Sequence, residues 1–555
     1  MRLLLPLALA LAASPALAAR PAPVSDSPLH AYVIGRYAAL DNDVVLASRL
    51  MDEARAARPA ASNVTRRAWE LALISGDRRK SFQLARALAV SDGPDPDIAM
   101  IRIADAALRN DWPQVAQLRQ GLGSQGWPIV AGPIIDAWAA AARGDAAAAL
   151  LLTDPQRAQG FMRGYMAEQR AHLLAYLGRW DEAATAYRQA RAGGGPAPMF
   201  LRQGQADALA MAGKREEALA VLFPGDPATA AARERLLAGK RLGPLAGEPR
   251  QGLAWLAVRL SGDLARERAE PLALLFARLS TWLAPELAIG WLATGDALGR
   301  AGYDAAALAA LDEVPAGLGM EVAVRARRAE VLEAAGRSEE AGTLLKAAAA
   351  APGATVEDWQ GLAGWHRRAG RFADAAQAYG TAIDRFAAGM GAAAWNLHYM
   401  RGAMRDAAGD WPGAEADLRA ALRLFPDEPA VLNHLGYSLM ERKGRSAEAR
   451  ALVEKAAQLR PGDGSIIDSL GWMQLQAGEV DAAVITLERA VSLEPQSWTI
   501  IGHLGDALWQ QGRRIEARFR WRQALGLDPG TEERRQLQAR LDFGLDAAPA
   551  MLAVR

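Results

Sequence analysis

The sequence predicts an all-α protein, a right-handed superhelical α-solenoid built from helix-turn-helix hairpins. Three observations predict this fold. Near the C-terminus four prolines recur at intervals of 35, 34 and 34 residues, namely Pro426, Pro461, Pro495 and Pro529. Small residues recur in register with these prolines. No convincing run of alternating β-branched residues predicts a strand.

The small residues in register mark places where two helices have to meet. Glycine fills the first site, and alanine fills the second and the third: Gly436, Gly471 and Gly505; Ala449, Ala483 and Ala517; Ala456, Ala490 and Ala524. A glycine inside a helix costs about 1 kcal/mol relative to alanine, so three in register need close helix approach as compensation. Each proline then starts the next helix, where its missing N–H costs least.

This pattern resembles the tetratricopeptide repeat family, whose repeat of about 34 residues carries Leu-Gly, Ala and Pro at fixed places. The resemblance is strongest over residues 433–529 and continues upstream through looser repeats. On that repeat length we expect about thirteen or fourteen hairpins. Their register is least defined over residues 92–163 and 227–285. The sequence departs from the family by one extra residue between Gly436 and Ala449, and by Leu439, Gln474 and Leu508 where the family has tyrosine.

The repeats and the termini suggest a division of the chain. The expected parts are a signal peptide (1–18), divergent helical repeats (19–226), an irregular helical segment (227–285), central repeats (286–428), regular C-terminal repeats (429–531), and a capping helix with a tail (532–555). The helix from Thr531 to Leu541 is polar, as expected at the end of a solenoid, where no neighbour covers an apolar face.

The first residues have the three parts of a secretory signal. Arg2 is followed by an apolar run from Leu3 to Ala13 and by the small-residue triplet that ends at Ala18, so we expect cleavage after Ala18. The run is too short to cross a bilayer about 30 Å thick. Cysteine is absent, which excludes disulfides and lipidation at a cysteine. We therefore expect a periplasmic protein without a membrane-spanning helix; an uncleaved anchor is the alternative.

The net charge of the chain is too small to create a strong electrostatic field around the whole molecule. The formal net charge is +1, from 64 basic and 63 acidic residues, which disfavours nucleic acid as a partner. The one basic cluster is Arg513, Arg514, Arg518, Arg520 and Arg522. A solvated helix face is its simpler interpretation, and contact with phosphate or anionic lipid is the alternative.

No group of residues predicts catalysis, a metal or a cofactor. Gly121, Gly123 and Gly126 satisfy G-x-G-x-x-G but follow a predicted helix rather than a strand, so we interpret them as a loop. The six histidines are scattered: His30, His172, His366, His398, His434 and His503. Metal sites need several converging ligands. Asp468 and Asp506 could converge as an acid and base pair, but without a second domain to form a cleft we interpret them as carboxylates of the repeat.

The family resemblance implies that the first helices of successive hairpins line a groove that holds peptides or helices. By repeat position, the groove residues are Asn433, Tyr437 and Met440; Asp468, Trp472 and Leu475; and Gly502, Asp506 and Trp509. Tyrosine and tryptophan suit such a surface because they bury large areas with few rotors to freeze. A tryptophan at helical spacing also fits a core position, and this alternative stays open. The clamp by which some family members grip a terminal carboxylate is not reproduced, since Tyr437 replaces an asparagine.

The last hundred residues look like those of exported proteobacterial tetratricopeptide adaptors, which bring a C-terminal processing protease to envelope substrates such as cell-wall hydrolases. The similar motifs are His434-Leu435-Gly436, Ser469-Leu470-Gly471 and His503-Leu504-Gly505. This resemblance implies a non-enzymatic scaffold with protein partners, although the lipidation cysteine of the lipoprotein adaptors is missing. The alternatives are a subunit of an exopolysaccharide or outer-membrane assembly machine, and a cell-wall-degrading enzyme with a helical collar.

Overall fold

The computed structural model describes residues 27–59, 61–91, 95–192, 198–223, 227–243, 245–317, 319–443 and 447–546. All regular secondary structure in these residues is helical, which confirms the all-α prediction. The expected signal peptide lies outside the described residues. The chain divides into two units, residues 1–344 and 345–555, and this division falls inside the segment expected to hold the central repeats.

Unit 1 begins with α1 and ends within α19. Its helices are α1 (Pro28–Leu40), α2 (Val44–Ala57), α3 (Ser62–Ser75), α4 (Arg78–Ser91), α5 (Pro96–Leu108), α6 (Trp112–Arg119), η1 (Gln120–Leu122), α7 (Pro128–Ala142), α8 (Ala146–Leu152), η2 (Pro155–Arg157), α9 (Met162–Tyr176), α10 (Trp180–Ala192), α11 (Pro198–Met211), α12 (Arg215–Val221), α13 (Pro227–Leu237), α14 (Pro249–Arg266), α15 (Glu270–Leu283), α16 (Ala288–Arg300), α17 (Asp304–Asp312), α18 (Glu321–Ala334) and α19 (Ser338–Ala350).

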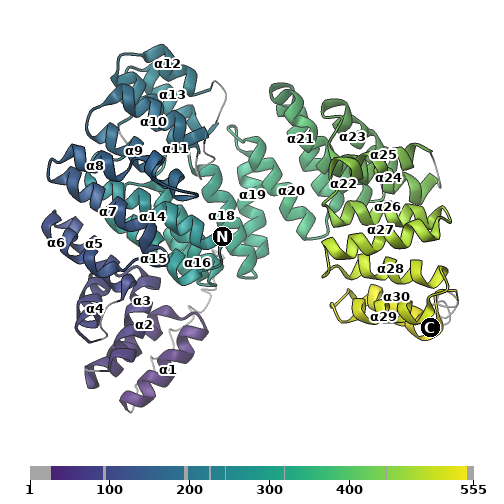
Figure 1. Ribbon diagram of the computed structural model, residues 1–555, viewed down its shortest axis with the longest axis horizontal. Helices are drawn as coiled ribbons and strands as arrows, with labels where there is room; N and C mark the ends of the chain where they lie inside the picture. Colours follow the sequence, from purple (N-terminus) through teal and green to yellow (C-terminus); the bar gives the residue numbers. More distant parts are fainter. Residues whose placement is uncertain are drawn as a thin grey trace, which may run out of the picture. The chain divides into compact units, whose positions relative to one another are not determined.

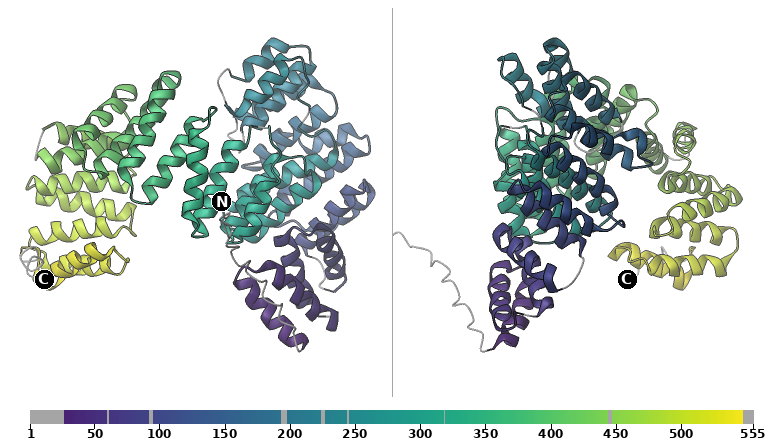
Figure 2. Two further views of the ribbon diagram at one scale, coloured as in Figure 1. Left: turned by 180° about the vertical axis from the view of Figure 1, so that it is seen from behind. Right: turned by 60° about the vertical axis from the view of Figure 1, so that its left-hand side comes forward.

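Unit 2 contains the regular C-terminal repeats. Its helices are α20 (Val356–Arg368), α21 (Phe372–Met390), η3 (Gly391–Ala394), α22 (Trp395–Ala407), α23 (Trp411–Leu424), α24 (Pro429–Lys443), α25 (Ala447–Leu459), α26 (Gly464–Gln476), α27 (Val480–Leu493), α28 (Trp498–Gln510), α29 (Arg514–Leu525) and α30 (Thr531–Phe543). In both units consecutive helices pack as antiparallel pairs that stack side by side (Figures 1 and 2). The described helices are therefore arranged as an α-solenoid of hairpins.

Short turns with a left-handed residue join the two helices of a hairpin. Between α26 and α27, Gly478 has φ +80°, and the next amide, of Glu479, donates to the carbonyl of Gln474 at 2.9 Å. This bond satisfies a carbonyl that the end of α26 would otherwise leave free. Asp463 caps the start of α26 by accepting a hydrogen bond from the amide of Ile466 at 3.1 Å. Local sequence thus sets where each helix begins and ends.

The glycines in register lie where helices touch, as the sequence predicts. A β-carbon at Gly471 would lie 2.7 Å from Cγ of Leu487, across the α26–α27 pair. At Gly505 it would lie 2.5 Å from Cδ1 of Trp521, across the α28–α29 pair. Both distances are shorter than non-bonded carbon atoms allow, so only glycine fits these positions without a shift of the neighbouring helix.

The segment 227–285, expected to be irregular, ends in a long-range helix pair. Helices α14 and α15 form a hairpin that packs on the first helices of earlier pairs: α14 contacts α5, α7 and α9, and α15 contacts α3 and α5. Phe276 of α15 meets Trp127 edge-on with ring centroids 4.9 Å apart, and Trp282 meets Phe82 in the same way at 5.5 Å. The chain itself therefore covers the first-helix face of unit 1.

Candidate functional site

A groove runs across the first helices α22, α24, α26 and α28 of unit 2. Helix α26 contacts both α24 and α28, so residues at equivalent repeat positions come side by side. The groove encloses a volume of about 480 Å³, and its lining residues are Tyr399, Ala430, Asn433, His434, Tyr437, Asp463, Ser465, Ile466, Asp468, Ser469, Thr499 and His503. Its lining is mainly polar and aromatic.

Three of the sequence-predicted residues, Asn433, Tyr437 and Asp468, line this groove together. Tyr437 is half-buried, and burial, with a smaller effect of the Glu441 carboxylate, raises the pKa of its hydroxyl above the ordinary value. The hydroxyl therefore remains a hydrogen-bond donor at all physiological pH values. Trp472, also half-buried, is not among the lining residues, but its ring stacks on that of His503, which lines the groove, with centroids 4.2 Å apart.

Asn433 carries an unused hydrogen-bonding group. Its Oδ1 atom is buried and accepts no hydrogen bond within the described residues. A buried polar atom without a partner costs about 1 to 3 kcal/mol, so a ligand N–H that reached it would relieve that cost. This feature distinguishes Asn433 from the other groove residues.

The other predicted groove residues belong to the core, and for them the prediction is wrong. Met440, Leu475, Gly502, Asp506 and Trp509 are all buried by neighbouring helices. Most of them lie toward the C-terminal ends of first helices. There the next hairpin covers the side chains that were assigned to the groove by their repeat position.

Two of these core residues are bonded to other residues of the protein and are therefore not available to a ligand. Asp506 is 1% exposed. It accepts a hydrogen bond from Nε1 of Trp521 at 2.9 Å and pairs with Arg540 at 3.4 Å. Trp509 donates to the carboxylate of Asp546 at 3.1 Å. Because Asp506 is enclosed, it cannot act with Asp468 on a substrate in the groove.

Two histidines line the groove that were not among its predicted residues. His434 lies 3.0 Å from a carboxylate oxygen of Asp406 on the preceding first helix, and His503 lies 3.0 Å from Asp468 in the same manner. Both histidines directly precede the Leu-Gly pair of their repeats, and that shared position was the available signal. Within the described residues, no group of three or more His, Cys, Asp or Glu side chains could hold a metal ion.

The other sequence motifs occupy structural positions. Gly121 lies in the short helix η1, and Gly123 and Gly126 lie in the connection to α7 with φ of +74° and +65°. This stretch follows α6 and not a strand, as expected of a loop. His172 is a core residue: its Nδ1 lies 2.9 Å from the hydroxyl of Tyr187, and burial lowers its pKa to about 3.

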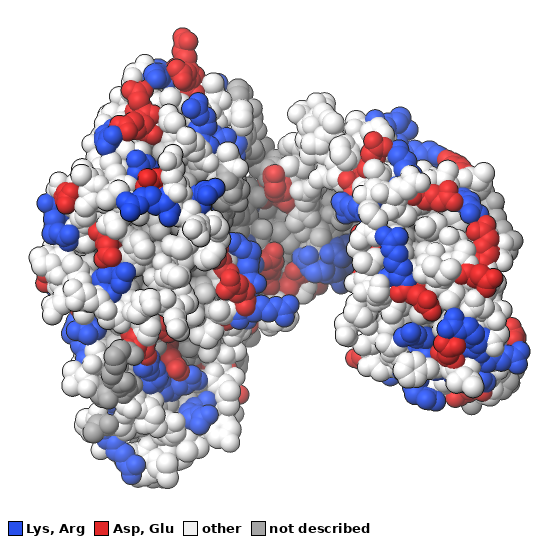
Figure 3. Space-filling view, in the orientation of Figure 1, with Lys and Arg blue, Asp and Glu red and all other residues white. Residues whose placement is uncertain are grey.

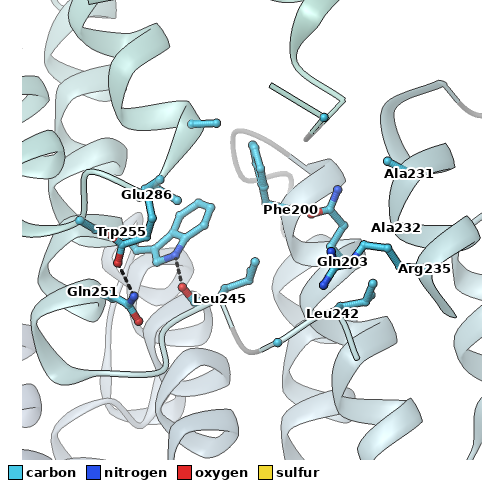
Figure 4. Close-up of a pocket in the computed structure, with 15 residues that line it drawn as sticks. Phe200, Gln203, Ala231, Ala232, Arg235, Leu242, Leu245, Gln251, Trp255 and Glu286 are labelled. Atoms are coloured by element: carbon cyan, nitrogen blue, oxygen red, sulfur yellow. Dashed lines mark hydrogen bonds between the residues drawn. The ribbon is translucent and has the colours of Figure 1, made fainter. Parts of the chain in front are cut away.

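A second cavity, of about 310 Å³, lies in unit 1 near the connection between α13 and α14. Phe200 and Trp255 border it, with Arg235 among the residues on its other side (Figure 4). Its polar side chains serve the connection itself: Trp255 donates to the carbonyl of Leu245 at 2.8 Å, and Arg235 donates to that of Arg241 at 3.0 Å. Two of the side chains that line the cavity are thus bonded to this connection.

The charge distribution on the surface and the character of the helices are both relevant to the kind of partner. Basic and acidic side chains are interspersed over the face of the molecule shown in Figure 3, in keeping with the formal net charge of +1. None of the described helices combines the length and the apolar character needed to cross a membrane.

Comparisons with known proteins agree with the repeat pattern. Residues 399–464 match the tetratricopeptide repeat family. The TPR repeat-containing protein PA4667 of Pseudomonas aeruginosa is 37% identical over 111 residues, which cover 20% of this chain and 19% of that protein. The chain thus matches about a fifth of the length of this relative.

Two solved structures are among those similar to this chain. The Cut9–Hcn1 hetero-tetramer of APC/C has 15% sequence identity and a TM-score of 0.36, with 87% of this chain and 96% of that chain covered. Yeast Tom70 has 13% identity and a TM-score of 0.37, with 95% and 96% covered. In sequence, the tetratricopeptide repeat match spans the part of the unit 2 groove that runs from Tyr399 to Asp463.

Proposed function

We propose that this protein is a non-enzymatic periplasmic scaffold that holds an extended segment of a partner protein in the groove of unit 2. The observation that carries the proposal is the groove across four first helices, which is lined by Tyr399, Tyr437 and by Asn433, whose amide oxygen has no hydrogen-bond partner among the described residues. Helical-repeat proteins use extended concave surfaces of this kind for binding.

The lining suits a peptide backbone. An asparagine amide can accept a hydrogen bond from a peptide N–H and donate one to a peptide carbonyl. Asn433 can therefore form hydrogen bonds with the main chain of an extended segment. Ser465 and Thr499 add hydroxyl groups along the same groove. Tyr437 and Trp472, which are both half-buried, offer apolar area to side chains of the ligand, as aromatic residues commonly do at binding surfaces.

The finer proposal concerns the partner. The resemblance of the C-terminal repeats to exported adaptors suggests that the bound protein is an envelope protein, such as a cell-wall hydrolase, presented to a C-terminal processing protease. The export signal expected over residues 1–18 supports a periplasmic site of action. A subunit of an exopolysaccharide or outer-membrane assembly machine is the second candidate, since its partners would use the same groove.

Site-directed crosslinking in cells tests the choice of partner. A photo-crosslinking amino acid at Ala430, in the groove, is compared with one at Ala451, which is exposed on α25. Capture of a protease or hydrolase from Ala430 alone supports the adaptor, whereas capture of a secretion-machine subunit supports the second candidate. Turnover of peptidoglycan by the purified protein would contradict a non-enzymatic scaffold.

Groove variants test the binding surface against a captured partner. Asn433→Leu should weaken binding at least tenfold without lowering thermal stability, because the lost Oδ1 atom has no hydrogen-bond partner among the described residues. Tyr437→Ala combined with Trp472→Ala should weaken binding by about 2 kcal/mol or more with unchanged helicity. Gln458→Ala, exposed on α25, is the control. Loss of fold in the double variant, with normal binding by Asn433→Leu, would show that these side chains are structural.

A further inference from the structure

The outer face of α29 carries two large apolar side chains that the fold does not use. Ile515 is 87% exposed and Phe519 is 61% exposed. They are four residues apart and therefore stand on one face of the helix. The opposite face, formed by Ala517, Trp521 and Ala524, is fully buried in the core of unit 2. The exposed pair thus lies outside the packing that holds α29 in place.

Arginines surround this pair. Arg514, Arg518 and Arg522 recur every four residues along α29, and Arg513 and Arg520 complete the cluster. The one acidic residue of the helix, Glu516, pairs with Arg513 at 2.6 Å. Four arginines and one glutamate leave an excess of three positive charges on α29, and the N-cap residue Arg513 adds a fourth, in a chain whose formal net charge is +1.

Arg514, Arg518 and Arg520 make hydrogen bonds and ring contacts with neutral groups, and Arg520 also contributes, after Arg513, to the lowered pKa of the Glu516 carboxyl. The guanidinium groups of Arg514 and Arg518 lie 5.1 and 5.0 Å from the ring centroid of Trp509. Arg518 also donates to the carbonyl of Leu541 at 3.3 Å, and Arg520 donates to the side chain of Gln523 at 3.0 Å. All of these partners are neutral.

Two equivalent helices of the preceding repeats, α23 and α25, are built differently. On α23, Arg419 pairs with Glu415 at 2.9 Å and with Glu448 at 2.6 Å. On α25, Arg450 pairs with Glu454 at 2.8 Å and with Glu479 at 2.6 Å. On α27, Arg489 donates to the carbonyl of Pro461 instead. At the start of α29, Arg513 pairs with Glu516 and, at 3.9 Å, with Glu488 of α27. The later arginines of α29 have no such carboxylate pair among the described residues.

We propose that the outer face of α29 docks on an anionic membrane surface. Arg514, Arg518 and Arg522 contact lipid phosphates, while Ile515 and Phe519 enter the boundary between headgroups and acyl chains. A lipid surface supplies both the negative charge and the apolar interior that this face requires, which is the pattern of helices that lie in a membrane interface. Helix α29 lies next to α30 at the C-terminal end of unit 2 (Figure 1). This surface is separate from the groove lining, so the inference does not depend on the proposed function.

Vesicle flotation with the full chain tests the proposal. Vesicles of equal parts phosphatidylglycerol and phosphatidylcholine are compared with vesicles of phosphatidylcholine alone. The protein should float with the anionic vesicles, at least tenfold more than with the neutral ones, and 0.5 M NaCl should release most of it, because salt screens contacts of exposed charges.

Variants at exposed positions locate the contact. Arg522→Gln should lower the bound fraction severalfold, and Ile515→Ser with Phe519→Ser should lower it tenfold with an unchanged circular dichroism spectrum. Val90→Ser, at an 89% exposed apolar residue of unit 1, and Arg450→Gln should bind like the wild type. The proposal is overturned by equal binding to both vesicle types, by no binding to anionic vesicles, or by α29 variants that bind normally. Binding of an acidic protein without vesicle binding would also overturn it.

Discussion

Trp138 of α7 and Gly252 of α14 lie in direct contact: a β-carbon at position 252 would lie 2.0 Å from Cε2 of the indole. The indole is fully buried, and its Nε1 donates to Gln169 of α9 at 2.8 Å. The ring therefore cannot move aside without breaking a buried hydrogen bond. This contact seats α14 on the first-helix face of unit 1, the face that remains an open groove in unit 2.

Substitution of Gly252 should loosen unit 1. We expect Gly252→Ala to lower the free energy of unfolding by about 1 to 3 kcal/mol, the usual effect of adding a methyl group to a filled core. Gly262 lies in the same helix, and a methyl group at that position would meet no atom within 4 Å, so Gly262→Ala is the control. It should stabilise by up to about 1 kcal/mol through helix propensity. Urea unfolding followed by circular dichroism measures both, and equal shifts would contradict the contact.

Arg278 of α15 should be needed to hold α3. It is 5% exposed and donates to the carbonyls of Leu73 and Ile74, at 2.8 and 2.6 Å, at the end of α3. Burial lowers the pKa of its guanidinium to about 10, so it is charged at neutral pH. Arg278→Met should cost about 1 to 3 kcal/mol because it leaves these carbonyls unpaired.

Hydrogen exchange locates this effect. In Arg278→Met, the amides of α3 and α15 should exchange faster, whereas Arg86→Met, which removes an exposed pair with Asp105, should change little. Unchanged exchange in α3 would show that Arg278 does not hold the two helices together.

Glu168 should make unit 1 less stable as pH rises through neutrality. Burial raises the pKa of Glu168 to about 7, although Arg259, 2.8 Å away, acts in the opposite direction. In the unfolded chain its ordinary value is 4.5. Between these two pKa values the folded state binds more protons than the unfolded state, so stability falls as pH rises from about 4.5 to about 7.

Glu168→Gln should remove this dependence. The free energy of unfolding, measured at pH 5, 6, 7 and 8, would then vary less with pH than in the wild type, by up to about 3 kcal/mol across the range. The difference between the two proteins is the quantity to follow, because other carboxylates titrate equally in both. If the two curves run parallel, Glu168 has the same pKa in the folded and unfolded chain.

Asp506 should prove structural. Asp506→Ala leaves Nε1 of Trp521 unpaired in the core, and we expect a loss of about 1 to 3 kcal/mol with faster hydrogen exchange in α28, α29 and α30. Asp528→Ala, at a 95% exposed side chain that pairs with Arg534, should cost less than about 1 kcal/mol. If Asp506→Ala weakened partner binding without lowering stability, Asp506 would be a binding residue of the groove and not a structural one.

The sequence by itself determined the helical hairpins and three of the residues that line the groove. The contacts at Gly471 and Gly505 join helices adjacent in the chain, and such contacts recur with the repeat, so their pattern is visible in the sequence. For the same reason Asn433, Tyr437 and Asp468 could be assigned to one surface: equivalent positions on stacked first helices must come side by side.

Only the tertiary structure decided which of these positions stay open. Met440, Leu475 and Trp509 also occupy equivalent positions on successive first helices, as the groove residues do, but neighbouring helices cover them. In unit 1 the pair α14–α15 covers the equivalent face through contacts such as that of Arg278 with Ile74, between residues about two hundred positions apart. Burial depends on everything that packs on a surface, whereas periodicity records only what adjacent helices do, and no local pattern encodes that difference.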